Sequence, residues 1–377
     1  MTIKQIQLFF LKTNGISSVC LVILIGFLGN SCAATERYMS DENGGTHKPE
    51  VAAELLSNEG QMPSLSGANE WLNSPKLTTE ELRGKVVLVS FWTYTCINWL
   101  RTDSYLRAWA EKYKGQGLVV IGVHSPEFEF EKDVAKVRRA AAELNVDYPI
   151  AIDSDHRVWR AFGNRYWPAF YFVDSKGQIR HHRFGEGDYA RSERVIQQLL
   201  AEAGGKNIPS DLVTANGQGV KAEADWNNLR SGENYLGFER TANFASPGGV
   251  LPDKSNLYAV PSKLLLNQWA LAGEWKFAAS SIKAEKPSGR IAYRFHARDV
   301  HLVMGSTNTA IPVRFRVLMD GKPPAISHGI DVDADGNGAV SFPRMYQLIR
   351  RAGEIGETLV EIEFLDSGAE LYAFTFG

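Results

Sequence analysis

Residues 86–98 of this 377-residue chain, VVLVSFWTYTCIN, decide its fold. Val86–Trp92 is an apolar run of strand length, which is typical of a strand buried on both faces of a sheet. From Cys96 onward the apolar residues recur at helical spacing, as Trp99, Leu106, Trp109 and Tyr113. The stretch therefore predicts a buried strand that leads through a short turn into a helix, with Cys96 at the helix start.

The flanking sequence continues the alternation of strands and helices. The strand-like segments are 118–123, 170–173 and 178–184, and the helix-like segments are 132–144 and 192–203. The turn DSKG at 174–177 joins the last two strands and predicts a hairpin. Alternation that ends in a hairpin predicts a mixed sheet with helices on both faces, so we expect an α/β domain over 61–205.

Beyond residue 219 the pattern changes to short strands between turns, with almost no long helix. Such strands are 290–295, 300–304, 313–318 and 358–364, and several of them alternate strictly between apolar and polar residues. Alternation implies one buried and one solvent-facing side, and the spacing suggests an antiparallel sandwich. We therefore predict a jelly-roll-like all-β sandwich domain over 219–377, joined to the first domain by a linker at 206–218.

The first 34 residues have the features of an export signal. Lys4 and Lys12 precede the ten-residue apolar segment Val19–Leu28, and small residues follow around Cys32. The apolar segment is shorter than the ~20 residues that a membrane helix needs. Cleavage after residue 33 or 34, lipid attachment at Cys32 and an uncleaved anchor are open alternatives. Each places the folded part outside the cytoplasm, in the periplasm or anchored to the membrane, behind a flexible linker at 35–60.

Composition excludes several classes of function. Charged residues make up 22% of the chain and the formal net charge is −2, which gives no electrostatic basis for binding nucleic acid. The sequence shows no nucleotide, haem or flavin motif, and we expect no cofactor.

Cysteine usage singles out one thiol. Of the three cysteines, Cys20 and Cys32 lie in the predicted signal, so cleavage after it leaves only Cys96. An exported protein with one cysteine has no internal disulfide, so the odd thiol requires an explanation. Backbone N–H groups at a helix start stabilise negative charge, so we expect Cys96 to be biased towards thiolate, the more so if Arg101 faces the sulfur. Pro168 precedes a predicted strand and is expected to form a cis peptide bond beside Cys96.

Several longer motifs occur at intervals along the chain. They are FWTYTCIN at 91–98, GVHSPEF at 122–128, the Pro168 segment, NFASPGG at 243–249, LNQWAL at 266–271 and RFHARD at 294–299. In their residues and in their order along the chain, these motifs resemble those of the TlpA-like thioredoxins. The resemblance covers residues 60–377 and is strongest to the extracytoplasmic thioredoxin of DipZ-type thiol:disulfide interchange proteins. The resemblance implies a thioredoxin-like fold, the DipZ-type β-sandwich behind it, and thiol–disulfide chemistry in the cell envelope. It also implies a site with Cys96 as the reactive residue and with Pro168, Trp92, Tyr94, Trp99 and Arg101 as neighbours at a substrate groove.

The sequence departs from the family pattern at one position that matters for the chemistry. Family members carry Cys-x-x-Cys, and Trp99 stands where the second cysteine belongs. In a dithiol exchanger the first cysteine attacks and the second releases the mixed disulfide, so Cys96 can form an adduct but cannot resolve it. We therefore do not expect dithiol-type disulfide reduction. Family members also usually carry a membrane electron-transfer domain before the thioredoxin, and a monothiol protein does not need that source of electrons.

Two functional hypotheses follow. In the first, Cys96 is a single redox-active thiol in thiol–disulfide or antioxidant chemistry with proteins or low-molecular-weight thiols, and an external thiol resets it. In the second, the thioredoxin fold is redox-dead, Cys96 is a small buried residue, and Trp99 fills the adjacent space of a binding or scaffold protein. His124 and Glu127, which follow a predicted strand near Cys96, are either proton donors or structural residues.

The second domain offers weaker signals. Its aromatic residues Trp226, Tyr235, Trp269 and Trp275 are either core residues or a carbohydrate-binding surface, and a protein ligand is the alternative. Residues 331–336 (DVDADG) resemble the start of a calcium loop. However, the twelfth position of that loop is phenylalanine instead of glutamate, which favours an ordinary turn and no metal.

Overall fold

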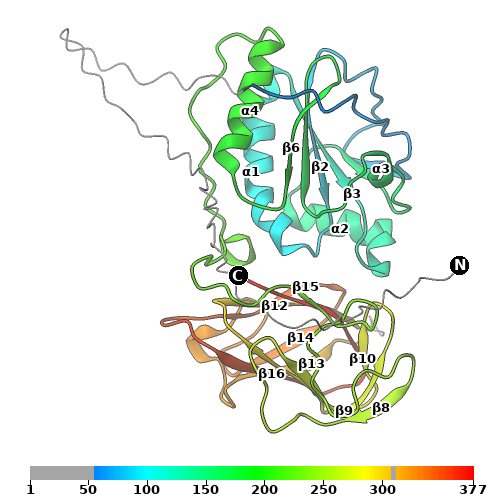
Figure 1. Cartoon of the computed structure of the whole chain (residues 1–377), viewed down its shortest axis with the longest axis vertical. Helices are drawn as coiled ribbons and strands as arrows, with labels where there is room; N and C mark the ends of the chain where they lie inside the picture. Colours follow the sequence, from blue (N-terminus) through cyan, green and yellow to red (C-terminus); the bar gives the residue numbers. More distant parts are fainter. Residues whose placement is uncertain (1–54, 307–310) are drawn as a thin grey trace, which may run out of the picture. The chain divides into compact units, whose positions relative to one another are not determined.

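The computed structural model describes residues 55–306 and 311–377 (Figure 1). The predicted signal at 1–34 and most of the predicted linker at 35–60 lie outside the described residues. Within the described ranges, no helix combines the length and the apolar character needed to cross a membrane. The described chain passes first through an α/β region and then through an all-β region.

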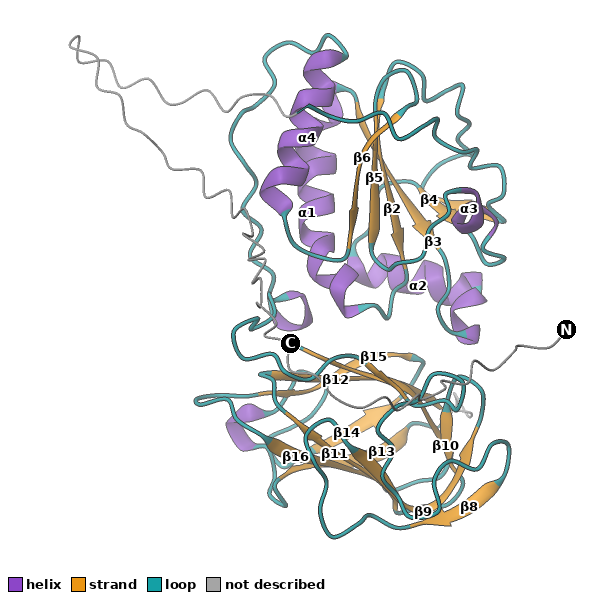
Figure 2. Cartoon of the chain, in the orientation of Figure 1, coloured by secondary structure: helices purple, strands orange, loops and turns teal. Residues whose placement is uncertain are grey.

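The α/β region is built on a six-stranded mixed sheet with the strand order β1-β4-β3-β2-β5-β6 (Figure 2). The strands are β1 (Glu70–Leu72), β2 (Val86–Trp92), β3 (Leu118–His124), β4 (Ile150–Ile152), β5 (Ala169–Val173) and β6 (Ile179–Phe184). β2, β3 and β4 run parallel, whereas β1, β5 and β6 are antiparallel to their neighbours. The register places Trp92 beside His124 and Phe91 beside Ala169. The mixed sheet with its terminal hairpin confirms the prediction.

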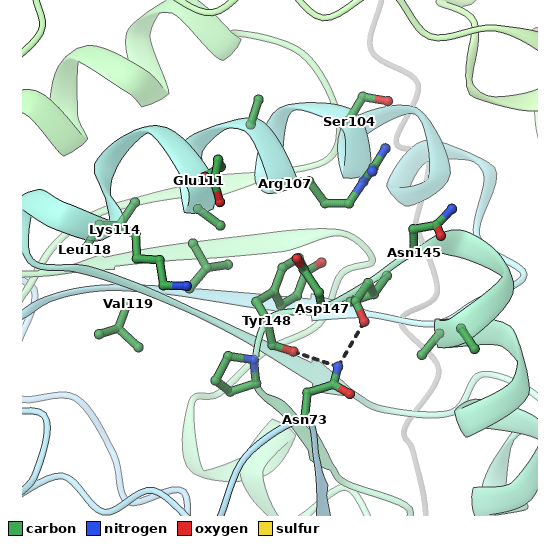
Figure 3. Close-up of a pocket in the computed structure, with 17 residues that line it drawn as sticks. Asn73, Ser104, Arg107, Glu111, Lys114, Leu118, Val119, Asn145, Asp147 and Tyr148 are labelled. Carbon is green, nitrogen blue, oxygen red and sulfur yellow. Dashed lines mark hydrogen bonds between the residues drawn. The ribbon is translucent and has the colours of Figure 1, made fainter.

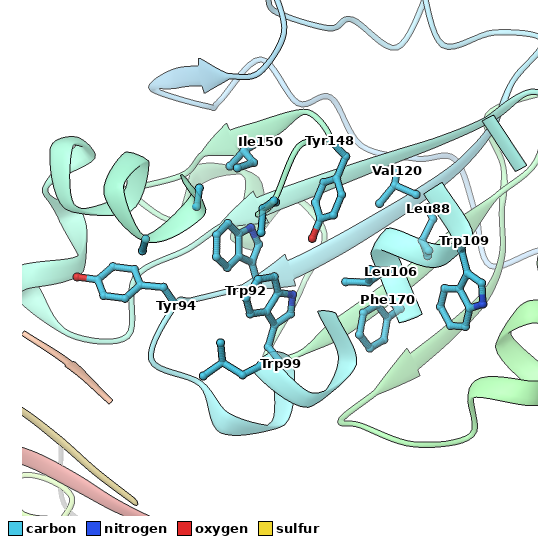
Figure 4. Close-up of a cluster of buried hydrophobic side chains, with 14 of the residues drawn as sticks. Leu88, Trp92, Tyr94, Trp99, Leu106, Trp109, Val120, Tyr148, Ile150 and Phe170 are labelled. Carbon is cyan, nitrogen blue, oxygen red and sulfur yellow. The ribbon is translucent and has the colours of Figure 1, made fainter. Parts of the chain in front are cut away.

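Two apolar cores flank β2, which explains why this strand is apolar on both faces; Figure 4 shows the one that contains Leu88 and Trp92. The helices are α1 (Ile97–Tyr113), α2 (Val134–Leu144), α3 (Arg157–Ala161) and α4 (Tyr189–Glu202), and the 3-10 helices are Lys114–Gln116, Glu129–Lys132, Gly219–Lys221 and Ala325–Ser327. Leu88 and Trp92 face the core that α1, α2 and α4 close. Val89 and Phe91 face the other core, to which α3 contributes Val158. Helices therefore lie on both faces of the sheet, as predicted.

The observed helices differ from the predicted ones at their starts. α2 begins at Val134 and not at residue 132, because the Asp133 carboxylate caps it by accepting a hydrogen bond from the Ala135 N–H at 2.9 Å. α4 begins at Tyr189, three residues before the predicted start. The short elements β1, β4 and α3 were not predicted.

The described residues of the all-β region form one 11-stranded sheet in which every pairing between two strands is antiparallel. The strands are β7 (Asn234–Tyr235), β8 (Ser255–Tyr258), β9 (Trp269–Phe277), β10 (Ile282–Ala284), β11 (Gly289–Phe295), β12 (Asp299–Ser306), β13 (Val313–Met319), β14 (Asn337–Val340), β15 (Arg344–Arg350), β16 (Thr358–Phe364) and β17 (Ala369–Phe376). The all-β class of the second region is thereby confirmed.

β9 connects two halves of this sheet. Its first half pairs with β11 and its second half pairs with β10. Gly273 lies between the two halves with φ +92°, and a Cβ there would approach the Cα of Gly289 to 3.2 Å, so the bend requires glycine. Leu271 and Trp275, from opposite sides of the bend, belong to one apolar core with side chains of β12, β13 and β16. The predicted sandwich is thus a sheet whose two layers are continuous through β9.

The two regions share buried apolar contacts. Tyr372 of β17 packs against Phe128 and Phe130, with ring centroids 5.0 and 4.8 Å apart. Val303 of β12 and Met345 of β15 belong to the same core as α1. The loop that follows β3 is therefore packed against the all-β region.

Candidate functional site

Cys96 lies at the N-terminus of α1, as the sequence predicts. β2 ends at Trp92, and a turn closed by a 3.2 Å hydrogen bond from the Cys96 N–H to the Thr93 carbonyl brings the chain to the helix. Cys96 is the N-cap residue of α1, and its carbonyl accepts the Leu100 N–H at 3.0 Å. Its thiol is free, and Cys96 as a whole residue is of intermediate burial.

The expected bias of Cys96 towards thiolate is wrong. Burial raises the pKa of the Cys96 thiol well above its usual value, and the negative charges of Glu127 and Glu233 raise it further. The backbone N–H groups of Trp99 and Asn98 act in the opposite direction, as expected at a helix start, but they do not prevail.

The sequence suggested that the positive charge of Arg101 could stabilise the Cys96 thiolate, but the Arg101 side chain is bound to other groups. Its side chain is 3% exposed and its Nη1 lies 3.0 Å from Oε1 of Glu186, in the loop between β6 and α4. Its Nη2 donates to the carbonyl of Phe376 in β17 at 3.3 Å. The guanidinium therefore links α1 to the loop between β6 and α4 and to the end of β17, and its hydrogen bonds are made to these two segments.

Trp99, at the position of the missing second cysteine, is a core residue. Its indole ring stacks on that of Trp92 with the ring centroids 4.1 Å apart, and both side chains are fully buried (Figure 4). The indole thus occupies the space beneath the helix start and does not line an open groove. The geometry agrees with the expectation that Trp99 fills space next to Cys96.

Tyr94 and His124 complete a buried aromatic group on the strand side of Cys96. The ring of His124 stacks on Tyr94 at 5.7 Å and meets Trp92 edge-on at 5.0 Å. Burial lowers the pKa of His124 to about 3, so the imidazole is neutral at pH 7. His124 is therefore an uncharged member of this aromatic group.

Pro168 follows a cis peptide bond from Trp167, as predicted. Because Phe91 pairs with Ala169, the register brings Pro168 to the end of β2, beside Trp92. The indole N–H of Trp167 donates to the Ser125 carbonyl at 2.9 Å, which fixes the Pro168 segment against the loop after β3.

A buried carboxylate that sequence reasoning missed joins the turn before Cys96 to the loop after β3. Glu131 is fully buried, and its Oε1 accepts the Thr95 hydroxyl at 2.6 Å. Its Oε2 accepts the backbone N–H groups of Glu127 and Phe128 at 2.7 and 2.9 Å. Burial raises the pKa of Glu131 to about 7 in spite of these hydrogen bonds. The charged segment around it is typical of a surface helix, so the sequence carries no signal for this role.

Sequence reasoning also missed a cluster of polar side chains, which we name the acidic cluster. It consists of Glu127, Glu233, Tyr235 and Arg240. The Tyr235 hydroxyl lies 2.5 Å from Oε1 of Glu127 and 2.9 Å from Oε2 of Glu233. Arg240 donates to the same Glu127 oxygen at 3.0 Å, and its guanidinium lies 3.3 Å from the centroid of the Tyr235 ring. Desolvation of its carboxylate within the cluster and the charge of Glu127 raise the pKa of Glu233, although the residue as a whole is exposed. More than a hundred residues separate Glu127 from its partners, so no local motif reveals the cluster.

The aromatic residues of the all-β region do not form the suggested carbohydrate surface. Trp269 and Trp275 are fully buried, so their faces cannot stack on a sugar. Tyr235 belongs to the acidic cluster, and only Trp226 of the four is exposed, at 53%.

Two of the three aspartates in the segment at 331–336 accept hydrogen bonds from neighbouring residues of the all-β region. Asp331 accepts a side-chain N–H of Arg344 and, at 2.8 Å, the backbone N–H of Gln347. Asp333 accepts the Asn337 N–H at 2.7 Å, in the geometry of a turn.

A large open pocket lies apart from the predicted site residues. It has a volume of about 1190 Å³ and is lined by α1, β3 and the connection from α2 to β4 (Figure 3). Arg107, Glu111 and Asp147 contribute charged groups to it, and the Asn73 amide donates across one end to the carbonyls of Val146 and Tyr148. None of the six predicted site residues lines it, so its size alone does not connect it to the thiol.

Comparison with known proteins assigns both regions. Residues 58–199 match the redoxin family, and residues 231–377 match the family described as the thioredoxin-like C-terminal domain. Protein DipZ of Mycobacterium tuberculosis is 34% identical over 329 residues, which are 86% of this chain and 44% of DipZ. The chain thus spans less than half of the length of that relative.

Thiol-disulfide oxidoreductase YkuV of Bacillus subtilis is 37% identical over 142 residues, which are 37% of this chain and 95% of YkuV. Among solved structures, the solution structure of an oxidised thioredoxin-like protein is 36% identical and covers 38% of this chain and 96% of its own, with a TM-score of 0.35. The identities, the two matched regions and their order lead to one assignment. The chain belongs to the DipZ- and TlpA-like thioredoxin family.

Proposed function

We propose that this protein is a cell-envelope thioredoxin-like protein in which Cys96 alone forms mixed disulfides with thiol or disulfide partners, and in which an external thiol resolves them. One observation carries the proposal. Cys96 is a free thiol at the N-cap of α1, just after β2, in a chain whose relatives include thiol-disulfide oxidoreductases. The envelope location rests on the signal-like features of the first 34 residues.

The proposed chemistry is disulfide exchange in two intermolecular steps. The Cys96 thiolate attacks a partner disulfide, whose S–S bond breaks, and the displaced partner sulfur leaves as a thiolate. An external thiolate then attacks the mixed disulfide, and Cys96 leaves and takes up a proton. Disulfide bonds are exchanged without net oxidation. With Trp99 packed in the core, no sulfur follows Cys96 in the helix to release the adduct from within.

The environment of the thiol predicts a slow reaction at neutral pH. The raised pKa of Cys96 leaves only a small fraction of the reactive thiolate. A thiol of high pKa is also a poor leaving group, so the mixed disulfide is expected to persist until an external thiol arrives in excess. Both properties distinguish the protein from a rapid dithiol reductase.

The test is the formation and release of the adduct in the native, full-length protein. The protein is incubated with the disulfide of 2-mercaptoethanol over a range of pH, and the peptide that carries Cys96 is analysed by mass spectrometry. We expect an adduct on Cys96 whose rate of formation still rises above pH 8.5, the ordinary thiol pKa, and which excess 2-mercaptoethanol removes. A Cys96→Ser variant is the control. An adduct that forms only in urea contradicts the proposal.

A second candidate function is a redox-dead binding protein. The stacking of Trp99 on Trp92 and the raised pKa of the thiol favour it, because both describe Cys96 as part of the packing around the helix start. This candidate predicts that Cys96 of the native protein stays unmodified at every pH at which the protein remains folded. The labelling experiment above therefore separates the two functions.

A further inference from the structure

The carboxylate of Glu131 joins the turn before Cys96 to the loop after β3. Glu131 is fully buried, and its Oε1 accepts the Thr95 hydroxyl at 2.6 Å. Its other oxygen, Oε2, accepts the backbone N–H groups of Glu127 and Phe128 at 2.7 and 2.9 Å. Hydrogen bonds to a carboxylate are shorter and stronger than those between neutral groups. Both oxygens are therefore used to hold the turn against the loop.

The loop that Glu131 binds is itself fixed to the rest of the α/β region. The N–H of Ser125 donates to the last carbonyl of β2 at 3.0 Å, and the Ser125 hydroxyl donates to the Asp153 carboxylate at 2.9 Å. The Ser125 carbonyl accepts the indole N–H of Trp167, at the cis peptide bond, at 2.9 Å. The loop is thus a fixed support, and Glu131 ties the turn to it.

The turn matters because Thr95 directly precedes Cys96, the N-cap residue of α1. At an N-cap the side chain faces the backbone N–H groups of the second and third helical residues, here Asn98 and Trp99, and these N–H groups favour a thiolate. This geometry requires the extended backbone that Cys96 adopts, with φ −77° and ψ 111°. A hydrogen bond from the side chain of the preceding residue restrains that conformation.

We propose that Glu131 is a positioning residue for Cys96: through the Thr95 hydroxyl it holds the turn in the conformation in which the sulfur reacts with a disulfide. The inference rests on the proposed function, because it concerns the reaction of the same thiol. Glu131 acts through Thr95 and not by contact with the reacting atoms. Without this hydrogen bond the turn samples other conformations, so a smaller fraction of the molecules presents the sulfur to a partner.

The test measures the rate at which the native, full-length protein reacts with the disulfide of 2-mercaptoethanol at one fixed alkaline pH. The Cys96 thiolate attacks one sulfur, the S–S bond breaks, and 2-mercaptoethanol leaves as a thiolate. Mass spectrometry of the peptide that carries Cys96 gives the rate, and circular dichroism shows that each variant is folded. Thr95→Val replaces the hydroxyl by a methyl group of similar size, whereas Thr95→Ser keeps the hydroxyl.

We expect Thr95→Val to slow the reaction about three- to tenfold, the factor that one hydrogen bond contributes to a conformational equilibrium. Thr95→Ser should react within about twofold of the wild-type rate, because the hydrogen bond is kept. Glu131→Gln should also slow the reaction, because the amide is a weaker partner for the hydroxyl, and it should have no further effect when combined with Thr95→Val. Loss of a negative charge near a thiol would by itself speed the reaction, so the direction of the change separates positioning from charge.

Glu193→Gln is the matched control. Glu193 is also a buried carboxylate, and it accepts the Tyr113 hydroxyl and the Val213 N–H, each at 2.7 Å, at the end of α1 that is far from Cys96. This variant should lower the free energy of unfolding and leave the rate at Cys96 unchanged. If Thr95→Val does not fold, the comparison of Glu131→Gln with Glu193→Gln decides the question.

Three results would overturn the positioning role and leave the proposed function in place. They are wild-type rates for Thr95→Val, a reaction of Glu131→Gln as fast as the wild type or faster, and a slowing by Glu193→Gln as large as that by Glu131→Gln. If the native wild-type protein does not react while the protein in urea does, the proposed function fails, and this inference fails with it.

Discussion

Replacement of Trp99 by alanine tests whether the indole at the position of the second cysteine supports the fold. Trp99 is fully buried and stacks on Trp92 at 4.1 Å. Truncation of a buried tryptophan to alanine costs about 3–5 kcal/mol, of which the aromatic pair accounts for ~1 kcal/mol. We therefore expect Trp99→Ala to lower the free energy of unfolding by about 4 kcal/mol.

The assay is urea unfolding followed by far-UV circular dichroism, which does not depend on tryptophan fluorescence. Trp226→Ala is the matched control, because the side chain of Trp226 is 53% exposed and its loss should cost less than about 1 kcal/mol. Trp99→Phe, which keeps a ring against Trp92, should fall between the two. If Trp99→Ala unfolds at the same urea concentration as Trp226→Ala, then Trp99 is not a core residue and it is free to line a groove at the thiol.

Three further predictions concern the surroundings of the site. Arg101→Met should lower the free energy of unfolding in urea by about 3–5 kcal/mol, because it leaves Glu186 buried without its partner. The pH dependence of Cys96 alkylation should stay the same in this variant. A shifted alkylation profile would show that Arg101 acts on the sulfur. Glu131 has its pKa raised to about 7, so the folded state holds its proton more tightly than the unfolded state, and stability should fall by about 3 kcal/mol as pH rises from about 4.5 to about 7. Glu131→Gln should remove that part of the pH dependence, as measured by urea midpoints across this range, and an unchanged dependence would contradict the assignment. Tyr94→Phe should leave the free energy of unfolding unchanged or raise it, because the Tyr94 hydroxyl is buried without a hydrogen-bond partner. Tyr113→Phe, which removes a hydroxyl bonded to Glu193 at 2.7 Å, should lower the free energy of unfolding by about 1 kcal/mol. Equal losses for the two variants in urea unfolding would refute this contrast.

The sequence predicted those features that depend on local pattern. A continuous apolar run indicates a buried strand whatever lies around it, and helical spacing of apolar residues indicates a helix. The sequence therefore predicted both β2 and the start of α1 at Cys96. β4 has only three residues and α3 follows His156 in the left-handed conformation without a side-chain cap, so neither leaves a periodic signal. Their positions depend on the sheet that they join.

The chemistry of the site was predicted less well, because it depends on contacts between distant segments. Arg101 stands in the right turn of the helix to assist the sulfur, yet its partners Glu186 and Phe376 lie far along the chain and direct it elsewhere. The pKa of Cys96 is raised mainly by burial, with smaller contributions from the charges of Glu127 and Glu233. A helix start by itself lowers the pKa of a thiol, and only the folded arrangement shows that burial outweighs it.

The apolar contacts of Tyr372 with Phe128 and Phe130 have a mechanical consequence for the loop after β3. They hold the segment that bears Glu127 against β17, so any movement of this segment away from β17 separates aromatic faces from one another. A partner that supplies its own apolar surface at this joint would offset the free energy of that separation, whereas a small polar molecule would not.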